Sequence, residues 1–478
     1  ADGSRYASKS LLSEGKWVKI RVDKTGIYKL SYADLKNMGF SDPSKVSVHG
    51  YGGWPLDEDF SKEYIDDVPS TPVWRGSDYL LFYGKGPVKW EYDSSSQTFV
   101  HTNNPYSLYG YYFVTDATPT NDMTSVAQAS GATNRITTYD DYLVHEQELV
   151  SLAKSGRELY GEDFSGATPR TLSTFSSIPG ITNEDAKVTM SFVSKVTSGT
   201  GVASLSINQS NVLDVSIRSN REEYVKALEG VSTAVWKGEK SEKNSVVVSY
   251  NSASHNNVRL NYVRLHFKRT LQPYGAYTFF RSIASIGNVS RFVVQGANAN
   301  TLVFDVTDAQ RVRLMETELN GSELTFSIPA GTLREFVLVR TDQSFISPEV
   351  VGEVENQNLH ALEQKDMIII AAKAFQTQAE RLAEEHRATD GLTVEVVDPQ
   401  SIYNEFSSGA PDATAYRRFM KMFYDRSVSA GNAPKYLLLF GDGIYDNRGI
   451  CSDVKNIARD NMLLTYQSRA SLFEYSGL

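Results

Sequence analysis

The 478-residue sequence contains a single cysteine, Cys451, which excludes intrachain disulfides and zinc sites built from cysteine. It also lacks a long hydrophobic run. No apolar stretch approaches the roughly 18 residues that span a bilayer, so we expect no transmembrane segment. Basic residues are not in excess, and the net charge of −9 argues against nucleic acid as a partner.

Several catalytic signatures are missing as well. The sequence has no G-x-S-x-G, no H-E-x-x-H, no P-loop and no G-x-G-x-x-G. These absences weigh against a serine hydrolase, a zincin, an NTPase and a dinucleotide-binding enzyme. No metal and no cofactor is predicted.

What is present indicates a globular protein of about three domains, at roughly 100–200 residues each. Hydrophobic residues make up 41% of the chain and charged residues 22%, which is enough for large cores. We predict a mixed β-rich domain over residues 1–115, in which 18–22 and 27–30 alternate apolar and polar residues and form a hairpin around the turn at 23–26. Ser31 is expected to cap a short helix. Residues 116–136 are rich in Thr, Ser, Asn and Gly and are predicted to be a linker or long loop.

Residues 137–365 are predicted to form an antiparallel β-sandwich, because short segments with a two-residue apolar period alternate with Gly, Ser and Asn turns. In one segment the period slips at Val263, which predicts a β-bulge.

The pattern changes at residue 366 to that of a parallel α/β sheet. Apolar strands are expected at 367–370, 392–397 and 436–440, and amphipathic helices between them. Gly391 is expected to end the first helix and Asp412 to cap the second. The run at 436–440 is short and wholly apolar, which favours a strand buried on both faces.

The candidate active-site edge is Gly441, Asp442 and Gly443, which directly follow that strand. In open parallel sheets, ligands bind beyond the carboxyl ends of the strands. Asp442, Asp446 and Asn447 place three oxygen-bearing side chains there. They are suited to bind a cation or a substrate amine, or to orient a catalytic histidine, but they are also the ordinary residues of a turn.

Two further groups have open interpretations. Cys451 is a candidate nucleophile if one of the seven histidines lies within hydrogen-bond reach, and otherwise a small loop residue. An acidic patch is suited either to calcium or to a solvated loop; it comprises Asp57, Glu58, Asp59, Glu63, Asp66 and Asp67.

Several stretches resemble the gingipain-type cysteine peptidases, and in particular those that act as sortases of the type IX secretion system. The most extensive match is KYLLLFGDGIYDNR at residues 435–448. Others are GKWVKI (15–20), GIYKL (26–30), GYGG (50–53), DYLLFYG (78–84) and HTNNPY (101–106). Together they cover residues 15–113 and 366–467.

The resemblance implies an exported enzyme at the outer membrane or cell surface of a Bacteroidetes-type bacterium. Such an enzyme cleaves the C-terminal sorting signal of secreted cargo and joins the new carboxyl end to a lipopolysaccharide amine. Its implied partners are the C-terminal domains of cargo and other outer-membrane proteins of the secretion system. The implied fold of residues 366–478 is the first half of a caspase-like domain.

In that family the catalytic His lies in a His-Gly motif after a later strand, and the catalytic Cys follows a further strand. Neither position occurs in this sequence, so no catalytic residue is assigned, the dyad is expected beyond Leu478, and this chain is predicted to be inactive. Three parallel strands alone would also leave an open apolar edge. The alternative is a non-catalytic surface adhesion or scaffold protein, which a ridge of exposed Tyr and Trp on the sandwich would favour.

Overall fold

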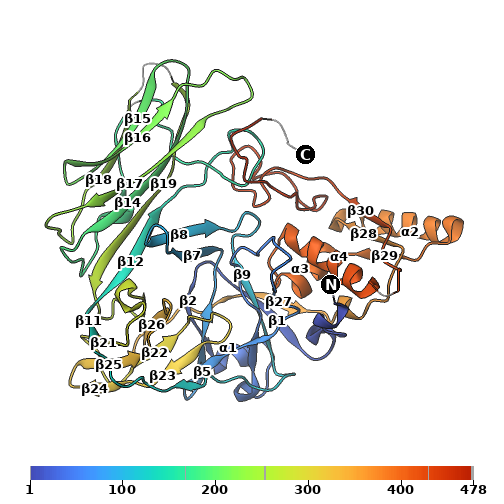
Figure 1. Ribbon diagram of the computed structural model, residues 1–478. Coiled ribbons are helices and arrows are strands. Elements are labelled where there is room, and N and C mark those ends of the chain that lie inside the picture. Colours follow the sequence, from blue (N-terminus) through green and yellow to red (C-terminus); the bar gives the residue numbers. More distant parts are fainter. Residues whose placement is uncertain (1, 167, 252–254, 429, 475–478) are drawn as a thin grey trace.

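The computed structural model describes residues 2–166, 168–251, 255–428 and 430–474. Figure 1 shows a β-rich molecule with the N-terminal sheets and one sandwich at the bottom, another sandwich at the upper left, and the helices of the C-terminal part on the right. The fold is therefore multidomain, with antiparallel sheets followed by a parallel α/β sheet, as the sequence predicted. No helix in the described ranges is both long and apolar enough to cross a membrane.

The N-terminal part consists of two small sheets over a shared core. One sheet has the order β27-β1-β9-β3-β4 and the other β2-β6-β5. The elements are β1 (Trp17–Val22), β2 (Gly26–Ser31), α1 (Tyr32–Asn37), β3 (Ser47–His49), β4 (Ser70–Thr71), β5 (Val73–Arg75), β6 (Tyr79–Gly84), β9 (Gly110–Thr115) and β27 (Glu349–Val354). The Ser31 side chain accepts a hydrogen bond from the Asp34 N–H and caps α1, as expected.

The hairpin predicted from residues 18–30 is wrong. Strand β1 pairs with β9 and β27, whereas β2 pairs with β6 in the other sheet. Ile20 from β1 and Leu30 from β2 are both fully buried in the core between the two sheets. The turn at 23–25 therefore carries the chain from one layer to the next, because both apolar faces are buried only when the layers stack.

A separate hairpin, β7 (Val88–Asp93) and β8 (Thr98–Asn103), reaches from the N-terminal part to the upper sandwich. Its Trp90 ring stacks on Tyr142, with ring centroids 4.1 Å apart. Phe99 of the same hairpin packs 5.1 Å from Tyr142. Aromatic contacts of this kind fix the position of the hairpin against the sandwich.

The first sandwich pairs the sheet β12-β19-β14-β17 with the sheet β13-β18-β15-β16. Its strands are β12 (Thr138–His145), β13 (Arg170–Thr171), β14 (Ala186–Val196), β15 (Thr200–Ile207), β16 (Ser210–Arg218), β17 (Leu228–Trp236), β18 (Val246–Asn251) and β19 (His255–Thr270). The predicted bulge is confirmed in β19: Ser191 pairs with Tyr262 and Phe192 with Leu260, which leaves Asn261 as the extra residue. It lies two residues before the expected slip.

The second sandwich pairs the sheet β10-β23-β22-β26-β20 with the sheet β11-β21-β25-β24. Its strands are β10 (Ser125–Val126), β11 (Asn134–Ile136), β20 (Tyr277–Phe280), β21 (Ser290–Val294), β22 (Thr301–Asp305), β23 (Arg313–Met315), β24 (Glu318–Asn320), β25 (Glu323–Ile328) and β26 (Phe336–Arg340). The range 137–365 thus contains two separate cores, one for each sandwich. Strands β10 and β11 lie within 116–136 and pair in parallel with the second sandwich. The domain boundaries themselves stay a prediction.

The parallel sheet has the order β29-β28-β30, and helices cover both faces of its central strand β28. Its elements are β28 (Met367–Ala371), α2 (Gln376–Asp390), β29 (Val394–Val397), α3 (Pro399–Phe406), α4 (Ala413–Ser427) and β30 (Tyr436–Phe440). Gly391 ends α2 at a φ of 65°, and Asp412 caps α4 by accepting from the Thr414 N–H. Both caps match the sequence prediction, whereas α3 was not predicted.

Strand β30 is an exposed edge, which corrects the prediction that it is buried on both faces. Leu438 and Phe440 pack toward α2. Leu437 and Leu439 lie on the opposite face, opposite Ile368 and Ile370 of β28, and are 46% and 51% exposed because α3 and α4 cover β28 but do not extend over β30. No strand of the described chain pairs with the outer edge of β30. The expected open apolar edge is therefore present.

We expect this edge to drive self-association of the 478-residue chain. The double substitution Leu437→Lys and Leu439→Lys should shift the chain toward monomer at micromolar concentration, because edge lysines oppose strand pairing. Size-exclusion chromatography with light scattering measures this. Val231→Lys, at a 50% exposed position of β17, is the matched control and should leave association unchanged. If the double variant and the control variant associate equally, the contact between chains does not involve the edge of β30.

Candidate active-site edge

Gly441, Asp442 and Gly443 follow β30 at the carboxyl end of the parallel sheet. A Cβ atom on Gly441 would lie 3.0 Å from both Ala372 Cβ and Leu463 Cγ. Glycine is therefore favoured here, because a larger residue would force the 461–465 segment or Ala372 to shift away from the strand end. Asp442 continues the sheet for one residue: its N–H donates to Asn461 O at 2.8 Å, and its carbonyl accepts from the Leu463 N–H at 2.8 Å.

The Asp442 side chain stays at the surface, where it accepts a hydrogen bond from the Gly443 N–H at 2.8 Å. Asp442 is the acidic residue of the predicted edge, and it is exposed to solvent. Its role as part of an active-site edge stays a prediction.

Asp446 and Asn447 organise the turn that follows. Asp446 is 3% exposed and accepts from the N–H groups of Gly449 and Cys451, at 3.0 and 2.7 Å. Asn447 exchanges hydrogen bonds with the backbone of Thr465, at 2.8 and 2.9 Å. Their oxygens are used by N–H donors rather than directed at a common point. Of the two readings of these residues, the structure favours the turn over the cation site.

Cys451 lies in an apolar cluster with Leu159 and Val454 and is 1% exposed. Burial, and then the nearby Asp446 carboxylate, raises the pKa of the thiol to about 12. A thiol needs the opposite shift to act as a nucleophile at neutral pH. The structural interpretation of Cys451 is therefore preferred over the catalytic one.

The seven histidines all lie in described residues, and each forms its hydrogen bonds away from Cys451. His386 bonds to Asp390 Oδ2 at 2.7 Å at the end of α2. The others contact protein groups in the N-terminal sheets, the first sandwich and the start of the α/β part. A Cys–His pair is thus absent from the part of the chain that the structure describes.

The residues of the acidic patch bond to different protein groups and do not converge on one cation. Asp57 and Asp59 accept from backbone and side-chain donors of their own loop. Glu58 forms an ion pair with Arg157 at 2.8 Å. Asp66 and Asp67 turn inward toward the α/β part.

A buried ionic cluster joins Asp66 and Asp67 to His360 and Glu405, and sequence reasoning missed it. The His360 ring bonds through Nδ1 to Glu405 Oε1 at 2.6 Å and through Nε2 to Asp66 Oδ1 at 2.7 Å. Burial alone would lower the pKa of His360, but the hydrogen bonds to Asp66 and Glu405 outweigh it and raise the pKa to about 9. The ring is therefore an imidazolium that donates from both nitrogens.

Asp67, His360 and Glu405 hold potential metal-ligand atoms within 4.8 Å of one another. Those atoms already have protein partners. Asp67 accepts from the Ser10 hydroxyl at 2.7 Å and the Leu11 N–H at 2.8 Å, and Glu405 accepts from the backbone N–H groups of residues 359 and 360. Because a protonated imidazole has no lone pair to offer, the cluster fits a structural role better than a metal site.

No sequence signal connects this cluster, since His360 and Asp66 are 294 positions apart. The acidic dipeptide at 66–67 was visible in the sequence, but its partner histidine was one of seven.

A pocket of about 300 Å³ lies beside the candidate edge, between the N-terminal part, α3 and the 444–464 segment. Arg448, Arg459 and Met462 line it from that segment, and Tyr109 and Tyr111 from the N-terminal part. Met462 is the backbone partner of Asp442, so the pocket opens next to the strand end.

Comparisons with known proteins agree with this architecture. The family model of peptidase family C25 matches residues 360–477, which begin at His360 and include the parallel sheet. The crystal structure of dimeric latent PorU from Porphyromonas gingivalis superposes with a TM-score of 0.91 at 34% identity, and the match covers 98% of this chain and 46% of that chain. The chain thus spans about half the length of that relative.

Two other solved structures share only small likeness. Bacillus endospore appendages match at 11% identity over 30% of this chain and 96% of theirs, with a TM-score of 0.15. A CBM35 module from Cellvibrio japonicus matches at 13% identity over 27% of this chain and 97% of its own, also with a TM-score of 0.15. Neither bears on fold or function. No curated protein sequence matches the chain.

The buried imidazolium predicts a pH-dependent stability. His360 has a pKa of about 9 when folded and an ordinary value of 6.5. A raised folded-state pKa stabilises the protein fully below about pH 6.5, and this stabilisation is lost as the pH rises through 9. Thermal unfolding between pH 6 and 10 should show this decline. His360→Gln should lower the free energy of unfolding by about 3–5 kcal/mol at pH 6, because it leaves buried carboxylates unpaired. The variant should also lose less stability than the unaltered chain between pH 6 and 10. His386→Gln is the control; an equal effect there would contradict the assignment.

The Cys451 thiol should resist alkylation. Its native pKa of about 12 compares with about 8.5 for a free cysteine, so iodoacetamide at pH 8 should react more than about a hundredfold more slowly with the folded chain than with the chain in guanidinium. Mass spectrometry of the labelled peptide gives both rates. Rapid stoichiometric labelling of the folded protein would instead identify an activated thiol.

Proposed function

This chain belongs to peptidase family C25, the gingipain family of cysteine peptidases. We propose that it is the N-terminal portion of a surface cysteine peptidase and transpeptidase of the type IX secretion sortase kind. The observation that carries the proposal is the 0.91 TM-score to PorU at 34% identity over 98% of the chain. At that identity and coverage, the likeness extends through the β domains as well as the parallel sheet.

The chemistry proposed for the whole enzyme is acyl transfer. A Cys thiolate, with its proton taken by a His, attacks the peptide carbonyl and forms a thioester while the amine of the sorting signal leaves. An incoming amine then displaces the thiol and yields an amide, or water displaces it and yields a free carboxylate. Cargo release and attachment to lipopolysaccharide are the two outcomes proposed for this step.

This chain supplies the scaffold of that site rather than its dyad. The pKa of the Cys451 thiol is raised to about 12, and the thiol has no histidine partner among the described residues. In the proposal, β28 and β30 form the first strands of the catalytic sheet. Gly441–Gly443 then form the near edge of the active site, and the outer edge of β30 pairs with a later strand of a longer protein.

The partners and location follow from the same resemblance. We propose that the protein is exported and acts at the outer membrane or cell surface, on the C-terminal domains of secreted cargo, together with other outer-membrane proteins of the secretion system. Processing of such cargo requires an extended peptide to reach the strand ends. The pocket beside Asp442 is the nearest concave surface for it.

The scaffold alternative receives less support. It was expected to show a ridge of exposed Tyr and Trp on the sandwich. Among the described residues of the first sandwich, Tyr224 is the one such side chain among the strongly exposed large hydrophobics, at 59%. A pocket beside the strand end is the feature that favours the enzyme.

The test compares the 478-residue chain with the protein encoded when the reading frame is followed beyond Leu478. The longer protein should contain a His-Gly motif and a strand-end Cys within about one domain length, and should cleave a peptide carrying a cargo sorting signal. Peptide cleavage followed by mass spectrometry is the readout. Activity should be lost when its strand-end Cys is replaced by Ala, and should be unchanged in the same protein carrying Cys451→Ala.

The 478-residue chain alone should release no product. Turnover by it that disappears in Cys451→Ala would place the nucleophile in this chain after all. A longer protein without the His-Gly motif or the thiol would favour the scaffold.

A further inference from the structure

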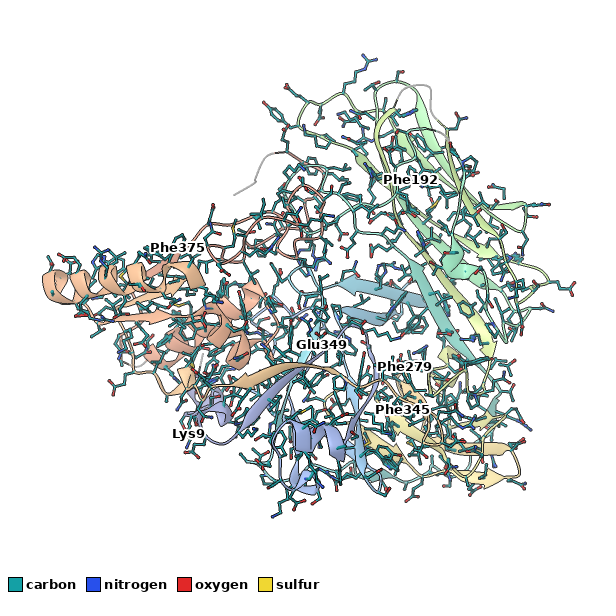
Figure 2. All side chains as sticks on the ribbon, turned by 180° about the vertical axis from the view of Figure 1, so that it is seen from behind. Lys9, Phe192, Phe279, Phe345, Glu349 and Phe375 are labelled. Carbon is teal, nitrogen blue, oxygen red and sulfur yellow. The ribbon has the colours of Figure 1, made fainter. Side chains whose placement is uncertain are left out.

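A large pocket lies where the N-terminal sheets, the β7–β8 hairpin and both sandwiches meet. Its volume is about 810 Å³. We call it the junction pocket and define it by Trp54, Tyr83, Trp90, Tyr142, Phe279 and Arg281, which all line it. Figure 2 labels Phe279 at this meeting point. A pocket of this size between domains is the usual setting of a small-molecule site.

Aromatic rings form its walls and hold one another in place. Tyr83 lies 5.8 Å from Phe279 and 6.3 Å from Trp54 between ring centroids, both edge to face. Trp90 stacks on Tyr142 at 4.1 Å. Because these rings come from strands and loops of different domains, they form a rigid apolar surface that a ligand can contact without ordering new side chains.

Polar groups with no protein partner accompany the rings. The hydroxyls of Tyr83 and Tyr142 and the indole N–H of Trp90 make no hydrogen bond within the described ranges, although all three residues line the pocket. Burial raises the pKa of both phenols, so they remain protonated donors at any physiological pH. Arg281 is fixed by an ion pair with Glu335 at 2.8 Å that engages one oxygen of that carboxylate.

The charges of the lining groups nearly cancel. Four carboxylates face three cations, the latter from Lys24, Lys89 and Arg281. A site for phosphate, nucleotide or another anion requires an excess of positive charge. The lining thus favours a neutral ligand that bears many hydroxyls.

A peptide strand fits less well. Strand β7 borders the pocket, but Pro87 directly precedes this strand and has no N–H to donate to an added strand. The free donors in the pocket belong to side chains rather than to a backbone edge. Rigid rings beside isolated hydroxyl and N–H donors suit a sugar, whose C–H faces pack on aromatic rings while its hydroxyls exchange hydrogen bonds.

We propose that the junction pocket binds a neutral oligosaccharide, with a pyranose ring against Trp54 and sugar hydroxyls bonded to Tyr83, Tyr142 and the indole N–H of Trp90. This site is separate from the candidate active-site edge and does not depend on the proposed peptidase activity.

The test is a titration of the 478-residue chain with maltotriose, mannotriose and the trimer of N-acetylglucosamine. Two of the five tryptophans line the pocket, so intrinsic fluorescence reports occupancy, and saturation-transfer NMR checks it independently. At least one trisaccharide should bind saturably with a Kd of about 1 mM or tighter. Inorganic phosphate, as the anionic probe, should not compete.

Variants assign the site. Tyr142→Phe and Tyr83→Phe each remove one hydroxyl while keeping the ring, and each should weaken binding by about three- to tenfold, the effect of one hydrogen bond. Tyr92→Phe, on the same hairpin but outside the pocket lining, is the matched control and should bind like the unaltered chain. Thermal unfolding verifies that all three variants fold.

Three results would overturn the proposal. They are the absence of binding by every trisaccharide well above the expected Kd, equal affinities of the Tyr142→Phe and Tyr92→Phe variants, and tighter binding of phosphate than of any neutral sugar.

Discussion

The buried imidazolium of His360 is the interaction on which the arrangement of this molecule depends. It joins Asp66 of the N-terminal part to Glu405 of α3, and both carboxylates also bond to nearby backbone N–H groups. Removing a charged group from water is unfavourable, and only the paired geometry offsets it. The N-terminal segment and the α/β part are therefore held in one relative position rather than joined by a flexible linker.

A second contact between the N-terminal part and α3 lies a few residues away from this cluster. Lys19 of β1 donates through Nζ to Asn404 Oδ1 at 3.0 Å and to Gly409 O at 2.8 Å. Because Lys19 is buried and its partners are neutral, this contact again requires close packing of β1 against the end of α3. The parallel sheet is thus presented from a rigid β-rich base, with the strand ends and the pocket beside Asp442 on its surface.

The β-rich part and the parallel sheet differ in how fully their apolar faces are buried. Each sandwich buries an apolar core between its two sheets, and the hairpin β7–β8 packs Trp90 and Phe99 against Tyr142 of the first sandwich. On strand β30, Leu437 and Leu439 remain about half exposed, whereas Leu438 packs toward α2. The two sandwiches are thus closed around their cores, while the outer edge of β30 has no partner strand among the described residues.

The sequence by itself determined the local elements: the cap at Asp412, the αL end at Gly391, the bulge in β19, and the strand–helix alternation after residue 366. Each of these elements depends on a few adjacent residues or on the regular spacing of apolar residues, and the sequence shows both directly. The strand end at Gly441 was also predicted correctly, because glycines after an apolar run mark such ends; its role as an active-site edge stays a prediction. Family resemblance supplied the proposed chemistry.

Only the tertiary structure decided which strands pair, which charges meet and which surfaces stay open. The turn after β1 is compatible with a hairpin or a change of layer, and the choice depended on burying Ile20 and Leu30 together. The Asp66–His360–Glu405 cluster and the junction pocket combine residues hundreds of positions apart. Their energies arise from desolvation and contact in three dimensions, which no local pattern encodes.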